Sequence, residues 1–374
     1  MPNSTSAPAT SSITLLLPRL SGWISQLVDD SRYPALEWLL ARATAQAALD
    51  NQLDPLRLKL FNRAIDGEIP VAALGLLASG SIPVSDHSYH LRLDPVTMQA
   101  DISRVVMMRS GFGGFPGKYC SEVQEIVRQV LADEGLQLQA ATGSDGGGGV
   151  GTAAVDHWTL TLPENPGVRF TALDDALGAD ISECLPEGEA GRRWKRLANE
   201  IQMALHASHA NEHRRQHGEP LVNGVWFWGG GRLPAMPPAK TFDRVFSNDP
   251  VSCGLAKLQQ VDVYPLEELL CRRGFSPDKP GSGLTPLRQG NILIDWAIPA
   301  SSSANEETQL TPDTLDAFCA EALAWLKQQG GSLDFHTPEF SCLMRSRDRL
   351  RFWRRPKLLA QQLQALIGKS EATG

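Results

Sequence analysis

The sequence predicts an α/β protein with a mixed sheet core and an inserted α+β segment. Short apolar runs alternate with amphipathic stretches near both ends of the chain, as strands and helices do in α/β folds. Residues 86–240 between them have a different hydrophobic pattern, with strand-like alternation first and a long helical stretch later. A chain of 374 residues, with 42% hydrophobic and 21% charged residues, can form one large domain or two ordinary ones.

The N-terminal part reads as a short tail, one strand and three helices. Residues 1–12 are polar and carry no basic segment before an apolar one, so we expect a disordered tail and no targeting sequence. The apolar run at 13–17, which Pro18 ends, predicts a buried strand. Three helices with a proline in the first turn are then predicted from Pro34, at 55–65 and at 70–79.

The middle of the chain, residues 86–240, is predicted to be the inserted α+β domain. Its first elements are strands at 90–93, 103–108, 136–140 and 158–162, a helix at 120–134, and a short helix or turn at 171–181. The glycine-rich run at 143–151 lacks the lysine and the strand-to-helix context of a phosphate loop. A flexible hairpin linker is therefore favoured there over a ligand loop.

A long helix is expected from Arg192 and, if it persists, to His217. Its buried stripe is predicted from apolar residues at steps of three and four, namely Trp194, Leu197, Ile201, Ala204 and Leu205. Four histidines at 206, 209, 213 and 217 would share another face. A solvated face is favoured for them because no HExxH motif is present, and an anion-binding face or a metal site stays open.

A strand is predicted at 221–228, followed by the glycine run 229–231. Glycines let the backbone approach a ligand closely, or simply take positive φ. Trp226 and Trp228 share one face of such a strand, where they either stack on a ligand or, as burial statistics favour, fill a core. The amide of Asn223 must find hydrogen bonds in this apolar setting.

The C-terminal third returns to alternating strands and helices. The predicted strands are 241–247, 291–298, 332–335 and 349–353, and the predicted helices are 253–259, 261–273, 311–329 and 357–367. Residues 301–307 are expected to form a solvated loop. Together these elements assign residues 13–85 and 241–356 to the α/β core, and 357–374 to a C-terminal helix and tail.

Charge and cysteine content exclude several classes of protein. A net charge of −7 gives no general basic field for nucleic acid. The local exception is a basic run formed by Arg345, Arg347, Arg349, Arg351, Arg354, Arg355 and Lys357. It fits an exposed edge strand protected by charge, or, less favoured, a contact surface for a phosphate-rich partner. Six cysteines without CxxC spacing indicate neither a zinc finger nor a disulfide framework, so reduced thiols and a cytoplasmic location are expected.

Several motifs occur together in the chain. They are NEIQM at 199–203, His206, Asn211, Arg214, Gly218, Pro220, Asn223 and VWFWGGG at 225–231, with HLRLDPV at 90–96, LPEG at 185–188 and RFWRRP at 351–356. This set resembles the RpfE-type bacterial regulatory proteins, a group related to the cofactor-independent phosphoglycerate mutases. The resemblance covers most of residues 13–356, and it implies that the mixed sheet core is a degenerate alkaline-phosphatase-like fold.

The same resemblance bears on activity. In the mutases the first strand ends in an Asp-Gly that begins a two-metal site, whereas this chain has Leu17-Pro18-Arg19 there. After the strand at 291–298 no histidine or aspartate of the expected pattern follows, and only Asp334-Phe335-His336 resembles a ligand pair. Metal-assisted phosphoryl transfer needs the whole clamp. We therefore expect no catalytic residues, no metal and no cofactor.

The resemblance implies a non-catalytic regulatory or ligand-binding protein. The alternative is an active phosphoglycerate mutase or phosphatase with an altered metal site. The expected ligand-binding residues are Asn199, Glu200, His206, Asn211, Arg214, Asn223, Trp226, Trp228, Gly229, Gly230 and Gly231. Arg214 would pair with a small phosphorylated or carboxylate ligand, unless this network only locks the inserted domain. No membrane partner is expected, nucleic acid is disfavoured, and a protein partner is left open.

Overall fold

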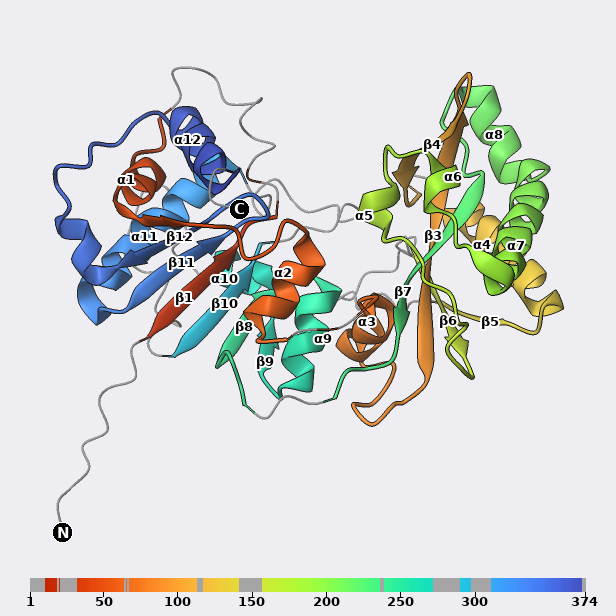
Figure 1. Cartoon of the computed structure of the whole chain (residues 1–374), viewed down its shortest axis with the longest axis horizontal. Coiled ribbons are helices and arrows are strands. Elements are labelled where there is room, and N and C mark those ends of the chain that lie inside the picture. The colour runs from red at the N-terminus through yellow and green to blue at the C-terminus, as the bar shows by residue number, and fades with distance from the viewer. Residues whose placement is uncertain are drawn as a thin grey trace, which may run out of the picture. The chain divides into compact units, whose positions relative to one another are not determined.

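The structure is a computed structural model that describes residues 11–18, 20, 32–63, 65, 67–112, 117–140, 157–235, 239–271, 290–296 and 311–371. The chain divides into two compact units, which Figure 1 shows in full. Unit 1 comprises residues 1–64 and 236–374, and unit 2 comprises residues 65–235. Helices accompany a sheet in each unit, and the sheet of unit 1 is mixed. The predicted α/β class with a mixed sheet core is thus confirmed.

Unit 1 is built on a sheet of order β2-β12-β11-β1-β10-β8-β9. Its strands are β1 (Ser12–Leu16), β2 (Thr44–Gln46), β8 (Arg244–Ser247), β9 (Asp262–Tyr264), β10 (Asn291–Asp295), β11 (Ser332–His336) and β12 (Ser341–Arg345). The five strands from β11 to β9 run parallel, whereas β12 and β2 are antiparallel to their neighbours. The carboxyl ends of β1, β8, β10 and β11 therefore meet at one edge of the sheet.

The helices of unit 1 are α1 (Pro34–Arg42), α2 (Leu53–Leu60), α9 (Pro250–Leu258), α10 (Leu266–Cys271), α11 (Pro312–Gln329) and α12 (Leu359–Glu371). Helix α1 packs against α11 and α12, and this group covers the sheet face that carries Ile13 and Leu15. Phe318 and Phe335 are at most 1% exposed there. Each buried apolar side chain of this size stabilises the fold by roughly 1.5–3 kcal/mol. Helices α2 and α9 contact each other.

Unit 2 contains an antiparallel sheet centred on β3. Its strands are β3 (Tyr89–Ala100), β4 (Val105–Ser110), β5 (Gln137–Ala140), β6 (Trp158–Leu162) and β7 (Gly224–Gly231), with β3 bound to β4, β6 and β7. Its helices are α3 (Val71–Ser79), α4 (Gly117–Asp133), α5 (Leu173–Ala176), α6 (Ile181–Cys184), α7 (Gly188–His206) and α8 (His209–His217). Helix α7 buries its predicted apolar stripe, apart from the half-buried Ala204, and packs on α4 and β7.

The division of the chain differs from the predicted one at three points, and the first is that residues 236–240 belong to unit 1. Residues 65–85 belong to unit 2, because the apolar helix α3 packs on β3 and β7. Ser12 begins β1 and is not part of a tail, since it pairs with Asn291 and Ser332 in the sheet. Residues 1–10 lie outside the described residues.

The expected long helix from 192 to 217 is two helices. Helix α7 ends at His206, and α8 starts anew because the Ser208 side chain caps it by accepting the amide of Asn211. The strand predicted at 221–228 lies instead at 224–231, so the three glycines are inside β7 and not in a loop after it. The row of histidines therefore does not share one continuous helix face.

Two C-terminal predictions also change. The segment 349–353 is not a strand, because residues 346–350 form a 3₁₀ turn in which Asp348 accepts the Arg345 amide at 3.0 Å. The strand of this region is β12, just before that turn. Residues 262–264 form β9, and the expected helix begins only after Pro265. The linker at 143–151 and the loop at 301–307 lie outside the described residues.

No helix in the described part of the chain is both long and apolar enough to cross a membrane.

Candidate functional site

The structure places Asn211 in the interior of unit 2, where it joins three main-chain groups. Its Nδ2 donates to the carbonyls of Leu205 and Val222 at 2.9 and 2.8 Å, and its Oδ1 accepts the Val222 amide at 3.0 Å. The side chain is 1% exposed. Asn211 therefore fastens the start of β7 to the junction of α7 and α8.

Arg214 and Asn223 also contact main-chain groups. The guanidinium of Arg214 donates to the carbonyls of Pro220 and Phe112, and burial lowers the pKa of this side chain. Asn223 extends the sheet, since its Oδ1 accepts the Met98 amide and its Nδ2 donates to the Met98 carbonyl, both at 2.7 Å. These contacts favour the locking role that the sequence left open for this network.

The two tryptophans of β7 are buried and use their indole N–H groups within the unit. Trp226 donates to the Thr171 carbonyl at 2.9 Å, and Trp228 donates to Asp94 at 2.5 Å. The same Asp94 accepts two hydrogen bonds from Arg92, whose guanidinium carbon lies 4.9 Å from the Trp228 ring centroid. Trp228 thus belongs to a closed polar group, as expected for a core residue.

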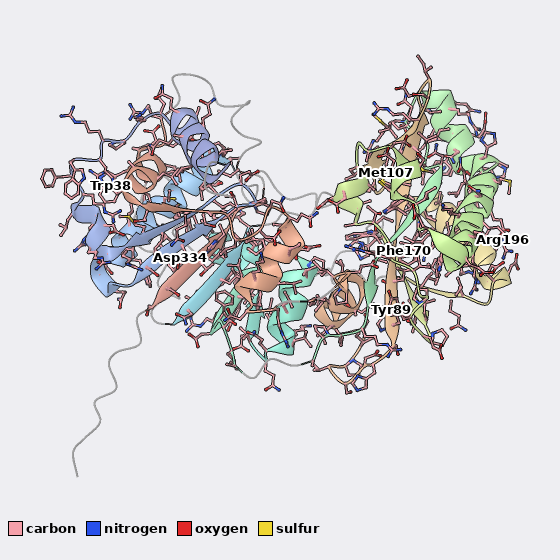
Figure 2. All side chains as sticks on the ribbon, in the orientation of Figure 1. Trp38, Tyr89, Met107, Phe170, Arg196 and Asp334 are labelled. Atoms are coloured by element: carbon pink, nitrogen blue, oxygen red, sulfur yellow. The ribbon has the colours of Figure 1, made fainter. Side chains whose placement is uncertain are left out.

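The glycine run accommodates the close approach of α3 and β3. A Cβ atom on Gly229 would lie 2.9 Å from Val71, and one on Gly231 would lie 2.7 Å from Pro70. A Cβ atom on Gly230 would meet the hydroxyl of Tyr89, labelled in Figure 2, at 2.5 Å. No larger residue fits these positions without displacement of the neighbouring atoms.

Glu68 lies beside these glycines, and no sequence motif pointed to it. Its carboxylate accepts the amides of Gly230 at 2.7 Å and Phe170 at 3.3 Å. Burial is the largest influence and raises the pKa of Glu68. Burial, together with the nearby Glu68 charge, raises the pKa of Tyr89 to about 12. The backbone amides of Gly230 and Phe170 are therefore occupied by hydrogen bonds to the Glu68 carboxylate.

The remaining predicted residues lie along α7. His206 is exposed at its end, and Glu200 forms an ion pair with Arg196 at 3.6 Å. His213 stacks on His217 with ring centroids 4.1 Å apart. The described residues contain no group of three or more metal-ligating side chains placed to hold an ion. Asn199 lines a pocket, as does Trp226.

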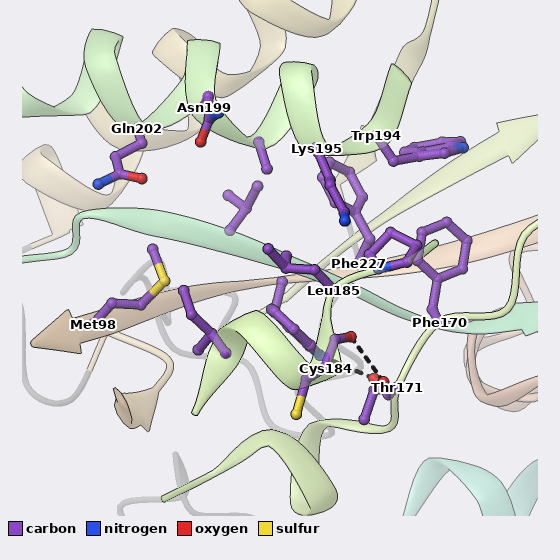
Figure 3. A pocket seen from close by; sticks show the side chains of 15 residues that line it. Met98, Phe170, Thr171, Cys184, Leu185, Trp194, Lys195, Asn199, Gln202 and Phe227 are labelled. Carbon is purple, nitrogen blue, oxygen red and sulfur yellow. Dashed lines mark hydrogen bonds between the residues drawn. The ribbon is translucent and has the colours of Figure 1, made fainter. Parts of the chain in front are cut away.

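That pocket lies between α7 and β7 and has a volume of about 150 Å³ (Figure 3). One wall is polar and is formed by Lys195, Asn199 and Gln202 of α7, which lie at steps of four and three on one helix face. The opposite wall is apolar and includes Leu185, Trp226 and Phe227. The pocket brings together two predicted residues, Asn199 and Trp226, with Leu185 of the LPEG motif.

The polar wall has unused hydrogen-bonding capacity. Within the part of the chain that the structure describes, the side chains of Lys195, Asn199 and Gln202 form no hydrogen bond or ion pair. The hydrogen bonds between lining residues lie elsewhere in the pocket: Thr171 Oγ1 donates to the Cys184 carbonyl at 2.8 Å, and Trp226 donates to the Thr171 carbonyl at 2.9 Å (Figure 3). Sequence reasoning missed Lys195 and Gln202, although their spacing from Asn199 already places the three on one face.

A second group of polar residues lies at the carboxyl edge of the unit 1 sheet. We call Arg57, Asp54, Asp249, Ser252 and Asp295 the Arg57 cluster. Arg57 Nε donates to Asp295 Oδ2 at 2.9 Å, Nη1 donates to Asp54 at 2.7 Å, and Nη2 lies 3.0 Å from Asp249. The Ser252 hydroxyl donates to Asp295 Oδ2 at 2.7 Å. The cluster ties α2 and α9 to the end of β10.

The elements that carry this cluster explain its position. Asp295 is the last residue of β10 and is 0% exposed. Asp249 caps α9 through the amides of Val251 and Ser252, and burial raises its pKa to about 7 against the lowering effect of Arg57. Nearby, burial lowers the pKa of His336 to about 4, and its Nδ1 lies 2.9 Å from the Ser341 hydroxyl.

The Arg57 cluster was not predicted from the sequence. An aspartate within the predicted buried strand 291–298 and the Asp249-Pro250 helix start were both visible signals. The partner Arg57 was not, because it lies 238 residues from Asp295 in the chain. Its guanidinium occupies the space among the carboxylates, so this edge carries a buried cation of its own.

The structure defines a protein of mixed α/β architecture. One unit has helices on a mostly parallel sheet, and the second unit has an antiparallel sheet. No family model matches the sequence, and no curated protein matches it either. The PH0037 protein from Pyrococcus horikoshii is similar in structure, with 12% identity, a TM-score of 0.47, and coverage of 91% of this chain and 88% of that one.

A cofactor-independent phosphoglycerate mutase from Thermoplasma acidophilum is also similar, with 14% identity and a TM-score of 0.39. The match covers 89% of this chain and 88% of the mutase. This is a distant likeness in fold, and it says nothing about activity. The names of these two proteins do not support the resemblance to RpfE-type proteins.

Proposed function

We propose that this chain is a ligand-binding regulatory protein of the RpfE type, and that unit 2 binds a small carboxylate or phosphorylated compound. The observation that carries the proposal is the pocket between α7 and β7. One of its walls offers a cation and two amides without partners among the described residues, and the other is apolar. Such a combination is typical of sites for small molecules.

The contacts define the ligand class. Lys195 supplies a positive charge beside an apolar wall, so an anionic group pairs with its Nζ. Asn199 and Gln202 each offer a donor and an acceptor one helical turn further along the same face. Trp226 and Leu185 take the apolar part of the ligand. A cavity of about 150 Å³ has the volume of a site that holds one benzene-sized ring.

A thermal-shift screen of small aromatic and aliphatic carboxylates and phosphates tests this proposal. A compound that binds the folded state raises the melting temperature as its concentration rises. Lys195→Met should weaken binding by roughly 10- to 100-fold, as expected for loss of a charge-assisted hydrogen bond. Arg192→Met, on the same helix outside the pocket, is the matched control and should bind like the unaltered protein.

Two results would count against the proposal. One is that no compound of the panel shifts the melting temperature. The other is that Lys195→Met binds a shifting compound as tightly as Arg192→Met does. A ligand that the Asp295→Asn variant no longer binds, but that the Lys195→Met variant still binds, would bind at the carboxyl edge of the unit 1 sheet instead.

The alternative function, a metal-dependent mutase or phosphatase, has less support in the described residues. The carboxylates at the sheet edge where such chemistry would be expected contact Arg57. A guanidinium among them repels a divalent cation. Turnover of 3-phosphoglycerate that depends on Mn²⁺ or Zn²⁺ would favour this alternative.

A further inference from the structure

A turn in unit 1 exposes three large apolar side chains next to each other. Leu350, Phe352 and Trp353 are 69%, 80% and 66% exposed, and we call them the apolar tip. Single exposed apolar residues are common, but a contiguous group with two aromatic rings marks an interaction site. The tip is therefore a candidate interaction site.

The apolar tip is held in place by hydrogen bonds. Arg351 Nη1 donates to the Arg42 carbonyl and to Thr44 Oγ1, both at 2.9 Å, and Arg354 donates to the Ala43 carbonyl at 2.9 Å. Arg351 also pairs with Asp348 at 2.9 Å. The turn thus presents the tip outward from a fixed base between α1 and β2, and its exposure is not that of a frayed end.

Basic residues flank the tip in the sequence. Asp348 is the one acidic residue within 345–357, and it already pairs with Arg351. By contrast, four basic side chains of this stretch form no ion pair or hydrogen bond with the described residues, namely Arg347, Arg349, Arg355 and Lys357. This local positive charge contrasts with the net charge of −7 of the whole chain.

We propose that the apolar tip and its basic rim dock on an anionic phospholipid surface. Tryptophan, phenylalanine and leucine partition into the boundary between headgroups and acyl chains, while arginine and lysine pair with lipid phosphates. Attraction of this kind acts within about 8 Å at physiological salt, so a local basic rim suffices despite the acidic whole. Peripheral docking needs no membrane-spanning helix.

The geometry of the rings favours lipid over nucleic acid. The rings of Phe352 and Trp353 meet edge to face, with centroids 5.3 Å apart and planes at 82°. Successive bases of a single strand stack on aromatic faces that are open in series, which this arrangement does not offer. Leu350 adds an apolar surface that a polyanionic strand cannot use.

Co-sedimentation of the full chain with vesicles tests the proposal. Vesicles of phosphatidylcholine alone are compared with vesicles of phosphatidylcholine and phosphatidylglycerol, at low and at high salt. We expect binding to the mixed vesicles only, and weaker binding at high salt. Arg349→Gln/Arg355→Gln should bind roughly thirty-fold more weakly, as expected for two basic residues near an anionic surface.

The apolar part is tested by Phe352→Ser/Trp353→Ser, which should abolish most binding. Met203→Ser is its matched control, because Met203 is 66% exposed on α7 of unit 2. The altered side chains are exposed, so circular dichroism and melting temperature should not change. A blue shift of tryptophan emission with mixed vesicles that is lost in Trp353→Phe would place this ring in the lipid boundary.

Three outcomes would overturn the proposal. They are a lack of preference for the anionic vesicles, equal binding by the serine double variant and Met203→Ser, and tighter binding of a single-stranded oligonucleotide that both double variants lose. The last of these would assign the surface to nucleic acid.

Discussion

Arg57→Met should be among the most damaging single substitutions in unit 1. Arg57 is 3% exposed and contacts Asp54, Asp249 and Asp295, so methionine keeps the packing of the stem but removes the cation. Asp295 is 0% exposed and cannot be hydrated without local opening. Removing one partner of a buried ion pair costs about 3–5 kcal/mol, and we expect a loss in that range from the free energy of unfolding.

The effect should depend on pH in a defined direction. Arg57 lowers the pKa of Asp249, so its removal should raise that pKa further above the unfolded value. Carboxyls of this kind are tolerated while protonated, so the variant's deficit should be smallest below about pH 4 and should grow as pH rises. The measurement is denaturant unfolding at several pH values, with hydrogen exchange of the β10 amides as the readout specific to unit 1.

Lys59→Met is the matched control on the same helix. Lys59 pairs with Asp50 at 2.9 Å, but its side chain is 52% exposed. A surface pair of this kind contributes about 0–1 kcal/mol. If Arg57→Met loses no more stability than Lys59→Met, or if its deficit shrinks as pH rises, our account of the Arg57 cluster is wrong.

Three further predictions concern both units. Asn211→Ala should lower the stability of unit 2 by about 2–3 kcal/mol without any ligand, because buried main-chain groups lose their partner; an unchanged melting temperature would refute the locking role. Gly230→Ala should cost about 1–3 kcal/mol through the contact with the Tyr89 hydroxyl, and Tyr89→Phe in the same chain should recover part of it in chemical denaturation. Asp249 has a raised pKa of about 7, so the folded state binds more protons than the unfolded state between about pH 4 and 7, and stability from this group falls as pH rises. Asp249→Asn keeps the helix cap and should flatten that part of the stability profile measured by denaturant titration.

The sequence by itself determined the class of fold and most elements. The apolar runs of β1 and β10 are buried on both faces in the parallel part of the sheet, which gives a continuous hydrophobic signal. Thr311 capped α11 as predicted, because an N-cap is a contact between residues close in the chain. The stripe of α7 was visible for the same reason, since helical periodicity is local.

Elements whose form depends on distant contacts were not determined in this way. The glycines of β7 looked like a loop because glycine is rare in strands, and the reason for them is the approach of Pro70 and Val71. A new helix starts after Ser208 because the Ser208 side chain accepts one capping hydrogen bond. This capped break is close in free energy to a continuous helix.

Only the tertiary structure decided which polar residues act together. Asn211, Arg214 and Asn223 were found from the sequence, but their partners are main-chain groups that folding brings close. Arg57 and Asp295 have no common motif, and the topology of the sheet alone places their charges in contact. Periodicity and caps act over a few residues and can be read from the chain, whereas burial and charge pairing depend on the complete fold.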